Sequence, residues 1–157
     1  MSTQAAHQLF IQAFHALLRE TFEEVNGIYL DRGTSLFETL ETISAEEASR
    51  PVSATSASIA AQVEHVRFYL ETLQRYARGE DVGTIDWEAS WQLTSVTADE
   101  WEALKERLRG EHQSLLSLVD DEADWDDKNI VDEAFAMLVH TAYHLGEIRQ
   151  ALCTIKQ

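Results

Sequence analysis

Proline and glycine, the residues that most often interrupt helices, are scarce in this sequence. One proline and six glycines occur among 157 residues, and both residue types destabilise the interior of a helix. Long, uninterrupted helices are therefore favoured. A chain of this length with 45% hydrophobic residues is sufficient for one domain with its own core. We expect a single domain over residues 1–157.

Cysteine is also nearly absent, because Cys153 is the one thiol in the chain. No disulfide can form within the chain, which fits a reducing compartment. We interpret Cys153 as a small apolar filler of the core rather than as a nucleophile. The first residues lack the pattern of a signal peptide, and no apolar run approaches the roughly 18 residues of a membrane span. We expect a soluble, cytoplasmic protein.

Basic residues are few, with 12 Lys and Arg against 28 Asp and Glu and a net charge of -16. Nucleic-acid binding requires clustered basic side chains that neutralise phosphates, and anionic membrane surfaces attract the same residues. We therefore expect neither a nucleic acid nor a membrane as a partner.

Apolar residues recur at helical spacing in four segments, near residues 3–25, 57–78, 98–119 and 129–154. A serine or threonine followed three residues later by glutamate predicts three capping boxes, which are Ser35 with Glu38, Ser44 with Glu47, and Thr97 with Glu100. The first two predict a short helix and one more helical turn. Residues 79–96 read as an irregular link that contains Trp87 and Trp91, and the acidic stretch 120–127 reads as a turn. The pattern predicts an all-α fold, a four-helix bundle with an additional short helix.

Three histidines suggest a metal site. His140 and His144 lie four residues apart, which places both rings on one face of a helix. His65 lies in another helical segment, and all three fall at the edge of an apolar stripe, with Gln62 and Tyr69 beside His65. Three protein ligands leave coordination positions open for water or substrate, as in catalytic metal sites. The alternative is that surface histidines fall at this spacing by chance.

The other histidines have simpler interpretations. His7 and His15 lie on the first helical segment without a histidine four residues away, and we expect them to be surface or boundary residues. His112 lies near the centre of an apolar stripe, so we expect a buried, hydrogen-bonded histidine. A role beside the metal or facing a substrate is the alternative for His112. The paired Glu-x-x-His motifs of di-iron bundles are absent, as are nucleotide-binding glycine motifs.

Two stretches carry a family resemblance. Residues 140–149 read His-Thr-Ala-Tyr-His-Leu-Gly-Glu-Ile-Arg, and residues 59–70 read Ile-Ala-Ala-Gln-Val-Glu-His-Val-Arg-Phe-Tyr-Leu. Both resemble the DinB-like family of metal-dependent four-helix-bundle proteins. The resemblance implies a divalent metal held by His65, His140 and His144. It implies zinc or nickel first, with iron or manganese as alternatives. The segment 27–34 looks like an insertion relative to the family and puts the alignment of the first helix in doubt.

The resemblance also indicates chemistry, because some relatives are thiol S-transferases and others are described as hydrolases. We expect a metal-dependent enzyme for a small-molecule substrate, with a low-molecular-weight thiol as one candidate. A metal held by neutral ligands can activate a water or a thiol. No general base is evident, since Glu133 lies about 10 Å along the helix from His140 at 1.5 Å per residue. A non-catalytic metal-binding or structural bundle dimer is the alternative.

The first helical segment suggests a homodimer. Its apolar residues cover more of the helix circumference than one core stripe requires. They are Leu9, Phe10, Ile11, Phe14, Leu17, Leu18 and Phe22. The alternative is that residues 27–43 cover the additional face.

Overall fold

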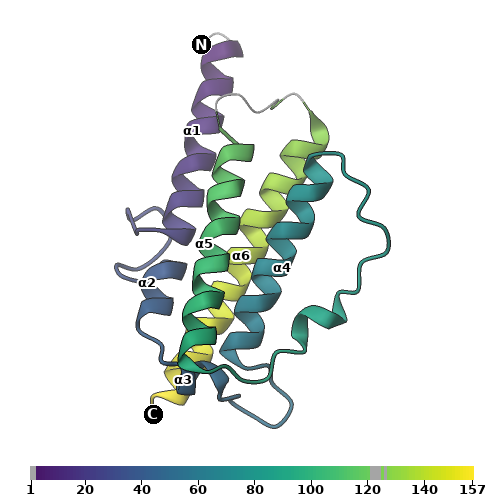
Figure 1. Ribbon diagram of the computed structural model, residues 1–157. Coiled ribbons are helices and arrows are strands. Elements are labelled where there is room, and N and C mark those ends of the chain that lie inside the picture. Colours follow the sequence, from purple (N-terminus) through teal and green to yellow (C-terminus); the bar gives the residue numbers. More distant parts are fainter. Residues whose placement is uncertain (1–2, 121–124, 126) are drawn as a thin grey trace. The chain divides into compact units, whose positions relative to one another are not determined.

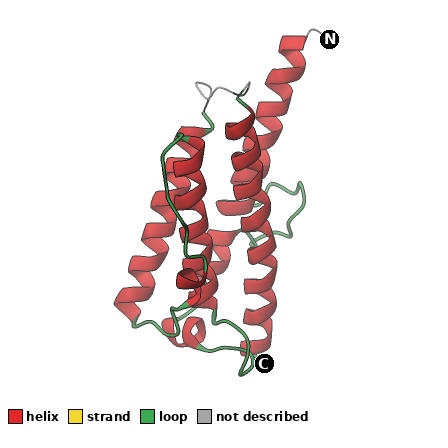
Figure 2. Ribbon diagram, turned by 90° about the vertical axis from the view of Figure 1, so that its right-hand side faces the viewer, coloured by secondary structure: helices red, strands yellow, loops and turns green. Residues whose placement is uncertain are grey.

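The computed structural model describes residues 3–120, 125 and 127–157. The chain divides into two compact units, and the boundary in the sequence lies between Thr42 and Ile43. Throughout the described residues the elements are helices joined by loops, without a strand (Figure 2). The predicted all-α fold is confirmed, and the architecture is consistent with the predicted helical bundle. None of the described helices is long and apolar enough to cross a membrane. The prediction of a single domain stays a prediction.

The first unit contains α1 (Thr3–Phe22) and α2 (Leu36–Glu41). Helix α1 ends at Phe22 rather than near residue 25. The predicted capping box opens α2, because the Ser35 side chain accepts from the backbone of Glu38 and the Glu38 side chain accepts from the backbone of Ser35. The rings of Phe22 and Phe37 lie 5.9 Å apart and join the two helices.

The segment between α1 and α2, expected as an insertion, is organised by Glu20. This carboxylate is fully buried. It accepts backbone N–H groups of Asn26, Ile28, Tyr29 and Leu30 at 2.7–2.9 Å. Burial raises the pKa of Glu20, but the backbone donors outweigh that effect and lower it to about 2. A buried charge is therefore retained because four amides of one loop surround it.

The second unit contains α3 (Ala45–Ser49), α4 (Ile59–Ala77), the 3-10 helix η1 (Glu88–Trp91), α5 (Ala98–Leu118) and α6 (Lys128–Ile155). Helix α4 packs against both α5 and α6 (Figure 1). The core of this unit consists of apolar side chains from the predicted stripes. They include Ile59, Val63, Val66, Leu70, Leu104, Leu108, Leu115, Leu145 and Ile148. Each is almost fully buried, so the stripes supply the hydrophobic stabilisation of the unit.

The remaining helix boundaries agree closely with the sequence. The capping boxes at Ser44 and Thr97 are both formed and open α3 and α5. The link between α4 and α5 is not wholly irregular, since η1 forms within it and packs against α4. The predicted acidic turn falls largely on residues 121–124 and 126, which lie outside the described residues.

Candidate metal centre

The structure brings the three predicted histidines together. His65 lies on α4, and His140 and His144 lie on successive turns of α6. One ligand nitrogen from each ring can be chosen so that all three lie within 4.8 Å of one another. The ring centroids are 5.0 Å apart for His65 with either partner and 4.5 Å apart for His140 with His144. The packing of α4 against α6 therefore converts a distant pair of sequence segments into one cluster of imidazoles.

The cluster is held in the neutral form. Burial, followed by the charge of His144, lowers the pKa of His65 to about 4, against a smaller raising effect of Glu147. Burial, followed by the charges of His144 and His65, lowers the pKa of His140 to about 3. Burial also lowers the pKa of His144, although Glu147 opposes the shift. Neutral imidazoles keep the lone pair that a metal requires.

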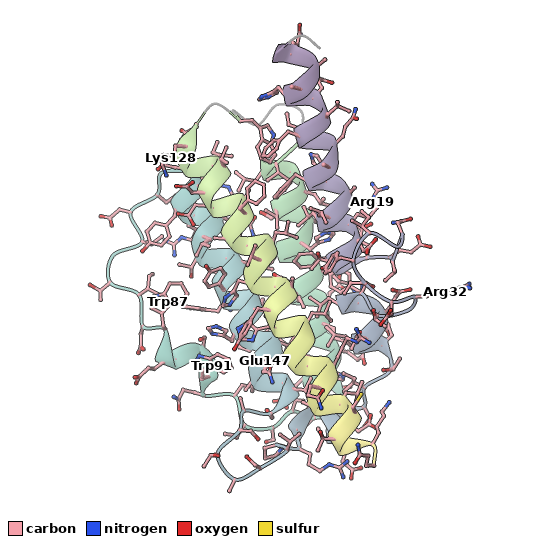
Figure 3. The ribbon with its side chains drawn as sticks, turned by 180° about the vertical axis from the view of Figure 1, so that it is seen from behind. Arg19, Arg32, Trp87, Trp91, Lys128 and Glu147 are labelled. Carbon is pink, nitrogen blue, oxygen red and sulfur yellow. The ribbon has the colours of Figure 1, made fainter. Side chains whose placement is uncertain are left out.

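His65 is held by the link between α4 and α5. Its Nδ1 lies 2.8 Å from Ser90 Oγ, and its ring stacks on Trp91 with a centroid distance of 3.9 Å. Both partners belong to η1. In Figure 3, Trp87 and Trp91 reach from the link toward the helices. Trp87 contacts Phe68 and Tyr69 on α4, so the link is fixed along α4 by aromatic contacts.

His140 is held by an aromatic stack. Its ring lies parallel to that of Tyr69, at a centroid distance of 3.6 Å. Its Nε2 is buried and has no hydrogen-bond partner. Buried polar atoms are normally paired, and a metal ion would satisfy this nitrogen. The prediction that Tyr69 lies beside the site agrees with this contact.

His144 is accompanied by a carboxylate one turn further along α6. Its Nδ1 lies 2.8 Å from Glu147 Oε2, although the ring is not aligned for a hydrogen bond. The hydroxyl of Tyr143 donates to Glu147 Oε1 at 2.8 Å. Carboxylates in this position orient metal-bound histidines in many proteins and raise their basicity.

A pocket of about 600 Å³ adjoins the histidine cluster. Trp91 and Glu147, which contact His65 and His144, form part of its wall, and Gln62 reaches it from α4. The Oε1 atom of Gln62 is buried without a hydrogen-bond partner. Glu147 and Trp91 are labelled near one another in Figure 3. The volume lies within the range of small-molecule sites.

These donors fit a divalent metal. Three neutral nitrogen ligands suit zinc, nickel and other borderline ions and leave the coordination shell incomplete. The unpaired Nε2 of His140, the contact of His65 with Ser90 and the contact of His144 with Glu147 are compatible with metal ligands. The cluster is compatible with metal binding, and the assignment of these residues as ligands stays a prediction.

Other predicted residues lie elsewhere. Glu133 is half-buried, and its pKa is raised by burial and by Asp132. The charge of Glu133 raises the pKa of Tyr69, after the larger effect of burial. Glu133 is not a member of the histidine cluster. His112 is buried in α5, where burial, followed by Arg109, lowers its pKa to about 4.

One interpretation is wrong. The sequence predicts that Cys153 fills the core, but the residue is exposed, because its position on α6 faces away from the stripe that contains Ile148 and Ala151. Two residues were missed. Ser90 lies in a link without periodicity, and no signal distinguishes it. Glu147 could have been found, since a carboxylate three residues after a histidine lies on the same helix face.

The comparisons with known proteins identify a family. The family model of the DinB superfamily matches residues 29–148, which include α4, most of α6 and all three histidines. The match begins after the end of α1, which the predicted resemblance also covers only loosely. No curated protein and no solved structure matches the chain significantly. Because the family model covers more than half of the chain, the protein belongs to the DinB superfamily.

Proposed function

We propose that the protein is a divalent-metal-dependent enzyme for a small molecule, with the metal held by His65, His140 and His144. The observation that carries the proposal is the convergence of three neutral imidazole nitrogens within 4.8 Å. Zinc or nickel suits these donors best, with iron or manganese as alternatives. A structural zinc normally has four protein ligands, whereas three ligands leave a position for water or substrate.

The bound metal would supply Lewis acidity, which lowers the pKa of a water or a thiol and provides a nucleophile near neutral pH. The chain supplies the surroundings. Trp91 and Tyr69 stack on two of the rings and keep water from their faces. Glu147 lies both beside His144 and in the pocket wall, so it is the carboxylate best placed to accept a proton from a bound substrate.

The pocket wall indicates the charge of the substrate. Glu147 is the one charged residue in the pocket wall among the described residues, and no described lysine or arginine lines the pocket. The carboxylate and the unpaired Gln62 Oε1 favour a ligand that donates hydrogen bonds. We therefore infer a neutral or positively charged small molecule rather than a polyanion. Thiol transfer and hydrolysis, the reactions that the family resemblance implies, both accommodate such a substrate.

Metal content tests the ligand assignment. The His140→Ala and His144→Ala variants should lose bound zinc or nickel after dialysis, whereas His7→Ala, which removes an exposed histidine, should keep it. Circular dichroism verifies that each variant remains helical. Full metal occupancy in the His140→Ala/His144→Ala double variant would show that the metal is bound elsewhere.

Activity tests the enzymatic part separately. The zinc-loaded and nickel-loaded proteins are assayed for conjugation of uncharged low-molecular-weight thiols to electrophiles and for hydrolysis of neutral esters and amides. The expected result is turnover that disappears in His140→Ala. A protein that binds metal at the three histidines but turns over none of these substrates would favour the non-catalytic metal-binding alternative.

A further inference from the structure

Ser90 forms two hydrogen bonds that connect the metal centre to the link. Its side chain is 2% exposed. Its Oγ lies 2.6 Å from the carbonyl oxygen of Trp87 and 2.8 Å from Nδ1 of His65. The residue is separated from His65 by 25 positions in the sequence, so the contact is made by the fold and not by local geometry.

The count of protons determines the direction of both bonds. A serine hydroxyl has one proton, and a carbonyl oxygen can only accept. The hydroxyl proton of Ser90 is therefore donated to Trp87, and its oxygen is left to accept. The proton between His65 and Ser90 must then be on Nδ1 of His65. In the neutral imidazole with its proton on Nδ1, Nε2 has the free lone pair.

This tautomer is the less common one for a neutral histidine in water, where the proton prefers Nε2. A partner at Nδ1 is the usual means by which proteins select the tautomer of a metal ligand. We infer that Ser90 is a positioning residue of the metal site, which accepts from Nδ1 of His65 and so presents the Nε2 lone pair to the metal. The inference rests on the proposed function, because it assigns Ser90 a role at the same three-histidine centre.

The surroundings of Ser90 support this role. The carboxylate of Asp86 accepts from the backbone N–H groups of Glu88 and Ala89 and caps the start of η1. Trp91, the residue after Ser90, stacks on the face of the same His65 ring. Two neighbouring residues of η1 thus hold the His65 ring, with Ser90 at the edge of the ring and Trp91 on its face. A serine that only stabilised the link would need its bond to Trp87 but not its bond to His65.

The tautomer of His65 is measured first, in the metal-free protein near pH 7. Long-range ¹H–¹⁵N NMR correlations distinguish a ring protonated at Nδ1 from one protonated at Nε2. We expect Nδ1–H in the wild type and a shift toward Nε2–H in Ser90→Ala. Gln92→Ala is the matched control, because it removes the bond from Gln92 to the carbonyl of Glu88 near η1 without contact to His65. A wild-type ring protonated at Nε2 would overturn the inference.

Zinc affinity is measured second, by competition with a chelator. Loss of a residue that hydrogen-bonds to a metal ligand typically weakens metal binding about 10–100-fold. Ser90→Ala should therefore show this loss, whereas Gln92→Ala should bind zinc as the wild type does. Ser90→Thr keeps the hydroxyl and should restore both the tautomer and the affinity. If the wild type binds neither zinc nor any of the other three divalent metals, the proposed function fails. If the wild type and a folded Ser90→Ala bind zinc equally, the role of Ser90 alone is wrong. Should Ser90→Ala not fold, the wild-type tautomer and Ser90→Thr still decide.

Discussion

Replacement of Glu147 should weaken the metal site through His144. The side chains approach to 2.8 Å between Oε2 and Nδ1, and a small rotation of the imidazole would align them, since that torsion is broad. Glu147→Leu removes both the charge and the acceptor. Carboxylates that hydrogen-bond to metal-bound histidines typically contribute this much in other proteins, so the dissociation constant for zinc should rise about 10–100-fold. This corresponds to a loss of about 1.4–2.8 kcal/mol of binding free energy.

The same loss should be visible in thermal unfolding. With zinc in excess over every dissociation constant, the stabilisation by zinc falls by the free energy lost from binding. A chain of this size changes its melting temperature by about 2–4 °C per kcal/mol. The rise in melting temperature on zinc addition should therefore be about 3–11 °C smaller in Glu147→Leu than in the wild type.

Two variants identify the cause of the effect. Glu147→Gln keeps an oxygen that can accept from His144 and should lose less affinity than Glu147→Leu. Tyr143→Phe removes the hydrogen bond to Glu147 Oε1 but leaves the contact with His144, and it should bind zinc almost as the wild type does. Competition with a chelator gives the zinc dissociation constant of each of the three variants. Equal zinc affinity in the wild type and Glu147→Leu would refute the reasoning.

Two further predictions concern the first unit. The pKa of Glu20 is lowered from 4.5 to about 2 in the folded chain, so its contribution to stability is complete above about pH 4.5 and is lost as the pH falls toward 2. The melting temperature should decline over this range more steeply in the wild type than in Glu20→Gln, and parallel curves would contradict this. Light scattering should give a homodimer near twice 17.8 kDa, and Phe10→Asp should dissociate it while Gln8→Asp does not. A mass of 17.8 kDa in the wild type would exclude a stable dimer.

Phe10 rather than Phe14 is the residue to replace in that experiment because of its exposure. Helical spacing alone does not distinguish Phe10 from Phe14, since both belong to a broad apolar surface. In the structure Phe14 is 1% exposed and Phe10 is 44% exposed. An aspartate at Phe14 would disrupt folding rather than association. Periodicity identifies which residues are apolar, but the packing partners decide which of them remain on the surface.

Local patterns predicted most of the helices and the three histidines of the cluster. Capping boxes depend on residues three positions apart, so Ser35, Ser44 and Thr97 could be recognised directly. His140 and His144 share a helix, and their spacing fixes their relative position. His65 was inferred from its place at the edge of a stripe, and the packing of α4 against α6 brings it to the other two.

The contacts around the three histidines were less predictable. Ser90 reaches His65 only because η1 folds back onto α4, and a single serine in a link without periodicity has no distinguishing pattern. Glu133, the carboxylate considered from the sequence, lies toward the N-terminus of α6 from His140. The carboxylate that contacts a histidine lies instead three residues after His144.

The exposure of Cys153 has a practical consequence for studies of the site. It is the single thiol of the chain, and its neighbour Thr154 lines the pocket together with Gln150. A maleimide dye would therefore attach at one defined place beside the pocket and could report ligand entry by its fluorescence. The same accessibility makes the protein itself a substrate for any electrophile in a thiol-conjugation assay. Cys153→Ser is accordingly the background in which such turnover should be measured.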